Sequence, residues 1–273
     1  CQSKKGIYFG TRENDMDILD YNRRAWNAES EADSEWSTPV SELTINEARA
    51  GNWSVRLTPN KDVPREWFGN ISGKNILCLA SGGGQQAPVL AAAGARISSF
   101  DLSDIQLQKD RLIAERDKLE IVTEQGDMKD LSRFANAQFD LIFHPVSNVF
   151  IPDLRPLWQE CCRVLKPAGR LLSGFMNPSY FLFDHYEAEA SGELKVKFSL
   201  PTSEPVPLDR TRNKVLEEKG HAYEFPHSLE AQLGGQLAVG FSIRGLYEDD
   251  WSHDATPLNA FSPTTIATLA IKN

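Results

Sequence analysis

The chain has 273 residues, a formal net charge of −9 at pH 7 and a hydrophobic content of 41%. This length fits one large α/β domain with an insertion, or two small domains, and the hydrophobic content suffices for a substantial core. The negative charge argues against a nucleic-acid backbone or an anionic membrane as the main partner. No apolar run reaches the roughly 18 residues that a membrane-spanning helix needs, so we expect a cytoplasmic protein without a membrane span.

The cysteines give no sign of a metal site or a disulfide framework. The chain has four of them, Cys1, Cys78, Cys161 and Cys162. None stands in a Cys-x-x-Cys pair or beside a histidine cluster with metal-ligand spacing. We therefore expect reduced thiols and no bound metal.

Residues 1–73 combine helix signals with aromatic side chains. The patterns predict a helix over Met16–Ala28, a second helix within Pro39–Ala50, and a loop over Gly51–Phe68 that packs by its aromatics. Two interpretations of these aromatics stay open. Either these side chains pack into the hydrophobic core, or they form a lid over a bound ligand.

A glycine-rich turn follows the first predicted strand. Asn75–Leu79 is a short apolar run typical of a buried parallel strand, and Ala80–Gly84 contains only small side chains. A helix over Gln85–Ala93 comes next, and free N–H groups at such a helix start favour a negatively charged group. The spacing Gly82-x-Gly84-x-x-Ala87, with Asp101 ending the next strand, fits a nucleotide-containing cofactor. Alone it fits NAD, FAD or S-adenosylmethionine (SAM).

The remaining pattern alternates strands and helices, which predicts a parallel sheet covered on both faces. Strands are expected over Arg96–Asp101, Leu119–Thr123, Phe139–Phe143 and Gly169–Phe175, and helices over Ser103–Lys118 and Leu154–Leu165. The inner face of the first of these helices is expected to carry Ile105, Leu107, Leu112 and Ile113.

Asn177–Pro226 breaks this alternation and reads as an insertion with a possible strand over Leu194–Leu200. Its aromatics either line a pocket or anchor the insertion to the core; they are Tyr180, Phe181, Phe183 and Tyr186. A helix over Ser228–Ala238 follows. The last two strands, Gly240–Glu248 and Thr264–Ile271, are expected to form an antiparallel hairpin.

Taken in order, five motifs resemble those of class I SAM-dependent methyltransferases, in particular the small-molecule branch related to ubiquinone and menaquinone methyltransferases. They are Cys78–Gly84, Asp101, Gly126-Asp127-Met128, Phe139–His144 and Val164–Gly169. The first motif departs from the family pattern acidic-x-Gly-x-Gly-x-Gly, because Cys78 replaces the acid and Ala80 replaces the first glycine. The resemblance implies an α/β fold with a seven-stranded Rossmann-like sheet, mostly parallel with an antiparallel last strand and helices on both faces.

The resemblance also implies SAM as the cofactor and a set of contact residues. The expected cofactor contacts are Ala80, Ser81, Gly82, Gly84, Gln86, Asp101, Leu102, Gln106, Asp127, Met128 and His144. The expected pocket for the methyl acceptor takes Tyr21, Trp26, Trp53, Ser147, Asn148 and Tyr180. Residues 1–73 would cover the cofactor, and residues 74–273 would form the methyltransferase domain, with the insertion at about 177–226 over the active site.

Several of these residues have a second interpretation. Asp101 either binds the ribose or caps the following helix, and Asp127 either contacts adenine or caps a helix near Lys129. Met128 either packs on adenine or belongs to the core. His144 is a base, an orienting group for the acceptor, or a structural histidine.

The sequence therefore predicts methyl transfer from SAM to a small, partly apolar acceptor. Two alternatives remain at this point: an NAD(P)-dependent oxidoreductase, and a non-catalytic SAM-binding protein. The identity of the acceptor and the oligomeric state are open.

Overall fold

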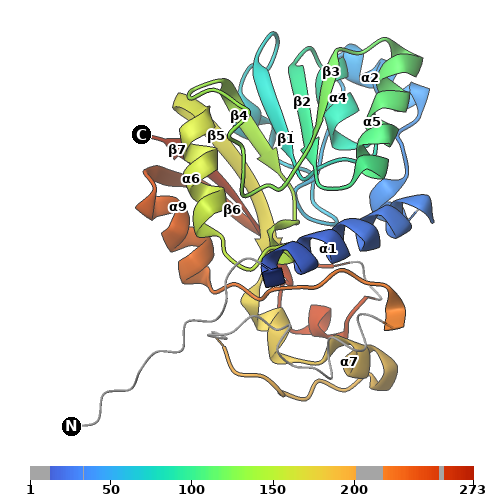
Figure 1. Ribbon diagram of the computed structural model, residues 1–273, viewed down its shortest axis with the longest axis vertical. Helices are drawn as coiled ribbons and strands as arrows, with labels where there is room; N and C mark the ends of the chain where they lie inside the picture. The colour runs from blue at the N-terminus through green and yellow to red at the C-terminus, as the bar shows by residue number, and fades with distance from the viewer. Residues whose placement is uncertain (1–12, 33, 201–217, 252–254) are drawn as a thin grey trace.

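The computed structural model describes residues 13–32, 34–200, 218–251 and 255–273. A seven-stranded sheet with the order β3-β2-β1-β4-β5-β7-β6 runs through the molecule (Figure 1). Its strands are β1 (Asn75–Leu79), β2 (Arg96–Asp101), β3 (Ile121–Gln125), β4 (Phe139–His144), β5 (Leu165–Met176), β6 (Phe241–Asp249) and β7 (Thr265–Lys272). The pairs from β3 to β5 are parallel, and β7 pairs antiparallel with both β5 and β6. The predicted sheet and its antiparallel hairpin are confirmed.

Helices cover both faces of the sheet (Figure 1). They are α1 (Glu13–Glu31), α2 (Glu42–Arg49), α3 (Arg65–Phe68), α4 (Gln86–Ala92), α5 (Asp104–Asp117), α6 (Arg155–Val164), α7 (His185–Ser191) and α9 (Gly235–Ala238). The chain also has short helical turns, η1 (Glu35–Ser37), η2 (Asn148–Phe150), η3 (Pro178–Leu182) and η6 (Pro257–Ala260), and a π-helix, η5 (Glu230–Gly234).

Alternate residues of the central strands pack into two cores, one on each face of the sheet. Cys78 and Phe143 join the core that includes α2, α3 and α4, whereas Leu79 and Ile142 join the core that includes α6. The strands are fully buried because each core covers one set of side chains, which explains their near-continuous apolar sequences.

Several predicted elements differ from the structure. β5 begins at Leu165 rather than at Gly169, and the predicted loop over Gly51–Phe68 contains the short helix α3. The inner face of α5 buries Gln106, Leu107, Asp110 and Ile113, and the prediction for Leu112 is wrong because its side chain is 55% exposed. β3 begins at Ile121, since Leu119 still closes the end of α5 through an N–H bond to the Ala114 carbonyl. The expected strand over Leu194–Leu200 is reduced to one bridge between Phe183 and Val196.

The insertion lies beyond the carboxyl ends of β4 and β5, on the same edge of the sheet as the turn after β1. The Phe225 N–H donates to the Val149 carbonyl at 2.6 Å, and Phe181 packs with Val149 and Met176 just after the ends of these strands. In Figure 1, α1 crosses directly below this edge, and α7 lies farther below it. Residues 201–217 of the predicted insertion fall outside the described residues.

The close approach of Gly174 to the loop before β1 yields a stability prediction. A Cβ at this position in β5 would overlap the Leu57 carbonyl oxygen and lie 2.9 Å from the Leu57 carbonyl carbon. That oxygen is already fixed, because it accepts the Val146 N–H at 3.0 Å. We expect Gly174→Ala to lower the free energy of unfolding by about 1–3 kcal/mol in a urea titration.

The matched control is Gly234→Ala in the π-helix, where the nearest atom to an added Cβ is the Glu230 Cγ at 3.6 Å. Its backbone is helical, so alanine should leave stability unchanged or raise it by up to about 1 kcal/mol. Equal effects of the two substitutions would contradict the close approach at Gly174.

Candidate active site

The turn after β1, residues 80–84, forms the base of the candidate site and is called the glycine turn below. Ala80 stands where the resembling motif has its first glycine, and it adopts a left-handed backbone with φ of 49°. The Ala80 N–H donates to the Phe100 carbonyl at 2.7 Å, which fixes this conformation against β2. The substitution of glycine by alanine therefore leaves the path of the turn intact, at the cost of local strain.

Asp101, at the end of β2, holds the glycine turn from one side. Its Oδ2 accepts the Gly82 N–H at 3.0 Å, and its Oδ1 accepts the Ser103 N–H at 2.9 Å. Burial raises the pKa of Asp101, and the backbone N–H donors partly oppose this effect. Ser103 rather than Asp101 caps α5, because its Oγ accepts the Gln106 N–H. A carboxylate has about four acceptor positions, so Asp101 retains capacity for ligand hydroxyls.

Asp110 of α5, which the sequence analysis missed, holds the last residue of the glycine turn. Its Oδ1 accepts the Gly84 N–H at 2.7 Å, and its Oδ2 accepts the Ser99 hydroxyl at 2.5 Å. The residue is fully buried, and burial raises its pKa to about 7. No sequence signal pointed to it, because its place on the inner face of α5 is visible only in the structure.

The third motif lies where β3 ends. The Gly126 N–H donates to the Asp101 carbonyl at 3.0 Å, so the ends of β2 and β3 are joined directly. Asp127 accepts the Lys129 N–H at 2.9 Å within a turn, and the alternative that it caps a helix is wrong because no helix begins there.

Met128 is 9% exposed and belongs to the core that includes α6. The Leu102 carbonyl accepts from the Gln125 side chain at 3.1 Å at the same edge.

His144 ends β4 directly beside the glycine turn. Its Nδ1 lies 2.9 Å from the Leu79 carbonyl oxygen and 3.4 Å from the Ser147 Oγ. A carbonyl oxygen only accepts, so Nδ1 carries the proton and Nε2 presents a lone pair. Burial lowers the pKa of His144 to about 4, so the ring is neutral at pH 7.

Residues 34–40, called the strap below, lie directly against the glycine turn. The Val40 N–H donates to the Gly84 carbonyl at 2.9 Å, and the Gln85 side chain donates to the Thr38 carbonyl at 3.1 Å. From α5, the Gln106 amide donates to the Ser37 Oγ at 2.8 Å. Ser37 is thereby fixed over the turn, together with the strap.

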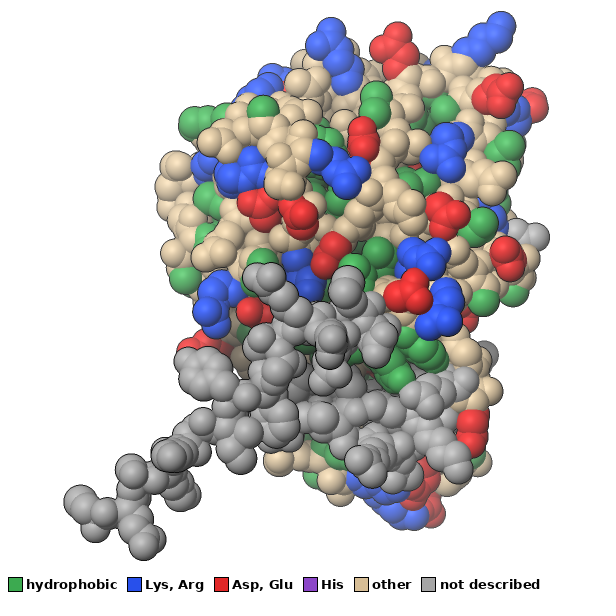
Figure 2. Space-filling view, viewed as in Figure 1, with side chains coloured by type: hydrophobic (Ala, Val, Ile, Leu, Met, Phe, Trp, Pro, Cys, Tyr) green, Lys and Arg blue, Asp and Glu red, His purple; other side chains and the backbone are tan. Residues whose placement is uncertain are grey.

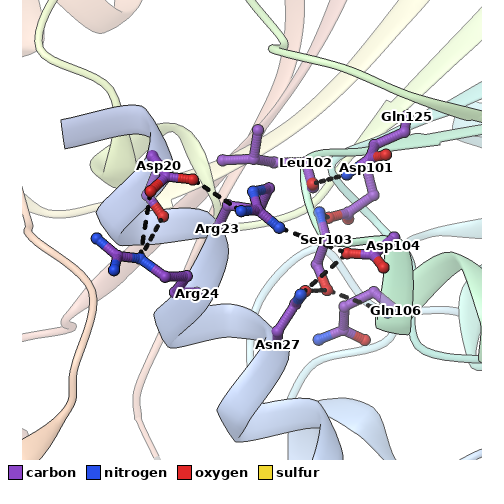
Figure 3. Close-up of polar contacts among 10 residues, drawn as sticks. All are labelled: Asp20, Arg23, Arg24, Asn27, Asp101, Leu102, Ser103, Asp104, Gln106 and Gln125. Carbon is purple, nitrogen blue, oxygen red and sulfur yellow. Dashed lines mark hydrogen bonds and ion pairs between the residues drawn. The ribbon is translucent and has the colours of Figure 1, made fainter. Parts of the chain in front are cut away.

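The helix α1 crosses the loop between β2 and α5 (Figure 3). The Ser103 hydroxyl donates to the Asn27 Oδ1 at 2.7 Å, and the Asn27 amide donates to Asp104 at 2.9 Å. Arg23 adds an ion pair with Asp104 at 3.9 Å. The N-terminal segment therefore reaches the predicted cofactor site at two places, the strap and α1.

On its other side, α1 contacts the insertion. Tyr21 stacks on Tyr223 with ring centroids 4.3 Å apart, and Trp26 meets the edge of Phe150 at 5.0 Å. Asn22 donates to the carbonyls of Phe150 and Tyr223. Tyr21 and Trp26 thus join the N-terminal helix to the segments that follow β4 and β5.

A third apolar cluster lies between α1 and the insertion. It contains Val149, Met176 and Phe181, with Val146, Phe150, Tyr180, Leu200 and Trp251 packed against them. Asn148 and Gln232 exchange two amide hydrogen bonds of 3.0 Å at its border.

Two residues expected at the site lie away from the other predicted residues: Trp53 of the acceptor pocket and Gln86 of the cofactor contacts. Trp53 packs on Phe68, below the Arg65 guanidinium, in the core beside α4. Gln86 accepts the Arg56 N–H at 3.1 Å. The structure therefore does not bring Trp53 to the other residues expected to form the acceptor pocket.

Three buried polar atoms near the glycine turn lack a partner among the described residues. They are the Ser81 Oγ, the Gln106 Oε1 and the His144 Nε2. Each such atom costs about 1–3 kcal/mol unless a ligand or water supplies the missing bond. The site therefore offers acceptors and a hydroxyl donor to a ligand with hydroxyl and ammonium groups, in addition to Asp101. This donor set fits SAM.

The fold and this constellation define a class I SAM-dependent methyltransferase. Residues 77–173 match the family model described as a methyltransferase domain. The chain is 51% identical to an uncharacterized methyltransferase, YbaJ, of Bacillus subtilis (strain 168) over 232 residues, which cover 85% of this chain and 91% of that protein. The chain belongs to this methyltransferase family, and its cofactor is SAM. This assignment decides against the oxidoreductase and the non-catalytic alternative.

More distant similarities agree with this assignment. The chain is 28% identical to the ubiquinone biosynthesis O-methyltransferase of Alkalilimnicola ehrlichii over 47% of this chain, and it spans about half of that relative, 53%. The crystal structure of a SAM-dependent methyltransferase from Mesorhizobium loti superposes with a TM-score of 0.59 at 19% identity, covering 76% of this chain and 95% of that one. The latter similarity concerns the fold.

Among the described residues, no helix is both long and apolar enough to cross a membrane. The same residues contain no group of three or more His, Cys, Asp and Glu side chains placed to hold a metal ion.

Because His144 is buried and neutral, it makes stability depend on pH. Between pH 6.5 and about 4, the unfolded chain protonates this histidine and the folded chain does not, so the unfolded state is favoured as pH falls. We expect the stability of the wild type relative to His144→Gln to drop by about 3 kcal/mol across this interval. Urea titrations of both proteins from pH 4 to pH 7 measure it, and a pH-independent difference would show that His144 is not held neutral.

Proposed function

We propose that this enzyme transfers the methyl group of SAM to a small, partly apolar acceptor bound between the glycine turn and the insertion. The observation that carries this proposal is the apolar cluster of Val149, Met176 and Phe181, which begins a few residues after His144. Ligands in open α/β sheets collect beyond the carboxyl ends of the strands, where this cluster lies. Apolar walls with a few polar groups are typical of small-molecule pockets.

The cofactor would lie across the ends of β1, β2 and β3. In this proposal Asp101 accepts from the ribose hydroxyls, and Leu102, Asp127 and Met128 lie at the adenine. Ala80, Ser81, Gly82, Gly84 and Gln106 surround the remainder, and the strap with α1 covers it, whereas Gln86 is engaged with the Arg56 backbone. Residues 1–73 thus serve the cofactor, whereas the insertion shapes the acceptor pocket of the domain formed by residues 74–273.

When bound, SAM would supply an electrophilic methyl group; its carbon–sulfur bond would break as the acceptor's nucleophile takes the methyl, and S-adenosylhomocysteine would leave. The protein contributes alignment of the two reactants and exclusion of water. His144 would orient the acceptor, because its Nε2 presents a lone pair and can accept an O–H or N–H from it. A pKa of about 4 makes it a weak base, so we assign it orientation rather than proton removal.

Surface charge and the relatives support a small acceptor. On the face shown in Figure 2, lysine and arginine side chains alternate with aspartate and glutamate over the described surface, unlike the basic stripe of a nucleic-acid-binding protein. One relative is named a ubiquinone biosynthesis O-methyltransferase, which supports a small-molecule acceptor. We also retain the cytoplasm as the proposed location.

Cofactor binding and acceptor class can be tested with the purified enzyme. SAM and S-adenosylhomocysteine should each raise the melting temperature, since a ligand that binds only the folded state stabilises it, and NAD should not. Methyl-labelled SAM is then offered with a panel of apolar phenols and amines and a matched panel of charged sugars and peptides. Transfer confined to the charged panel would contradict the proposed pocket.

Asp101→Ala should weaken SAM binding by about 1–3 kcal/mol, the scale for removing one charged hydrogen-bond partner. Isothermal titration calorimetry measures the change, and circular dichroism confirms that the variant is folded. Glu115→Ala is the control, because this exposed carboxylate lies near the other end of α5, away from the glycine turn and from α1. Unchanged binding by a folded Asp101 variant would remove Asp101 from the cofactor site.

A further inference from the structure

The first motif lacks the acidic residue that its family pattern places at position 78, yet a carboxylate does lie beneath the glycine turn. It belongs to Asp110 of α5, a residue remote in sequence from the motif. Asp110 is fully buried and close enough to Cys78 that its charge helps to raise the pKa of that thiol. The acidic group missing from β1 is therefore present in the same region, supplied by the neighbouring helix.

Asp110 contacts the turn directly through its two oxygens. One accepts the Gly84 N–H at 2.7 Å, and the other accepts the Ser99 hydroxyl at 2.5 Å. Gly84 in turn accepts the Val40 N–H of the strap at 2.9 Å. Asp110, the last glycine of the turn and the strap thus form one continuous hydrogen-bonded chain.

The electrostatic surroundings leave this carboxylate sensitive to pH. On β1 it faces the Cys78 thiol, and on β2 it faces Asp101, whose negative charge disfavours ionisation. On α5, Arg111 favours ionisation, whereas the Lys109 ammonium is directed to the carbonyls of Ser30 and Ser37. The helix α4, with the sequence QAPVLAA, has no titratable side chain.

Protonation would change what Asp110 can do. An ionised carboxylate only accepts hydrogen bonds, which matches the Gly84 N–H and the Ser99 O–H. A protonated carboxyl group has one donor, and its bond to a backbone N–H is no longer assisted by charge. Burial raises the pKa of Asp110 to about 7, so this change falls within the working range of an enzyme.

We propose that Asp110 is a positioning residue that replaces the missing acid of the first motif: its ionised form fixes Gly84 and the strap in the geometry that binds SAM. Binding of SAM is then coupled to ionisation of Asp110. The affinity for SAM falls as pH falls through neutrality, and SAM binding releases a proton from the fraction of enzyme in which Asp110 is protonated. This inference rests on the proposed placement of SAM at the glycine turn.

The test measures the dissociation constant of SAM by calorimetry from pH 6 to pH 8.5 for the wild type and for Asp110→Asn. The asparagine variant keeps the size and an acceptor oxygen but cannot ionise. If binding requires the ionised form, the wild-type dissociation constant rises by up to about tenfold from pH 8 to pH 6, relative to the variant. Groups on SAM titrate equally in both experiments, so the ratio of the two curves isolates Asp110.

Two further variants separate this role from a general effect on folding. Glu115→Gln removes an exposed carboxylate from the same helix. Its dissociation constant for SAM should rise from pH 8 to pH 6 by the same factor as that of the wild type. Asp110→Ala should weaken SAM binding, and adding Cys78→Asp to it should restore part of the affinity by returning the acid to its usual position. Melting temperatures without ligand monitor the fold of each variant.

The outcomes are distinguishable. Failure of the wild type to bind SAM at pH 8 would contradict the proposed cofactor site itself. Binding at pH 8 with the same pH dependence in the wild type and in Asp110→Asn would leave that site intact and overturn the role of Asp110. The same conclusion would follow if the wild-type affinity were constant from pH 6 to pH 8.5, a result that does not depend on any variant.

Discussion

The site depends on how the backbone N–H groups of the glycine turn are held. Ala80 bonds to β2, Gly82 bonds to Asp101, and Gly84 bonds to Asp110. A turn with three consecutive glycines is flexible in isolation, so these bonds replace the rigidity that its side chains cannot provide. Both carboxylates come from the β2–α5 unit. The position of the turn is therefore set by the neighbouring strand and helix as much as by its own sequence.

The N-terminal segment extends this arrangement over the site. The strap bonds to the same glycine that Asp110 holds, and α1 bonds to the residues that follow Asp101. The side chain of Gln106 links the strap to the glycine turn, because it lies beside Gly83 and donates to Ser37. Ordering of the strap and ordering of the glycine turn are thus coupled through a few hydrogen bonds, which gives residues 34–40 a direct physical route to influence cofactor binding.

Much of this architecture could be predicted from the sequence, for reasons visible in particular elements. β1 and β2 match their predicted bounds: β1 is an apolar run closed by the glycine turn, and β2 lies between Gly94, which ends the preceding helix, and Asp101 at the start of the next loop. Asp110 could not be identified, since a charged residue within a helix is usually solvent-exposed and only the contact with Gly84 shows otherwise. The insertion was predicted as a segment, but its contacts and those of the strap could not be, because contacts such as Asn22 with Tyr223 join residues about 200 positions apart.

The contrast between the two sides of the site bears on the acceptor. Beside the cofactor region lie two buried carboxylates, whereas the region after β4 is defined by a neutral histidine and an apolar cluster. A negatively charged acceptor group would lose its hydration here without gaining a cationic partner from the cluster, an arrangement that costs several kcal/mol. A neutral hydroxyl or amine can donate to His144 and bury its apolar part at the same time. In the proposed arrangement the polarity of the site therefore favours acceptors that enter uncharged.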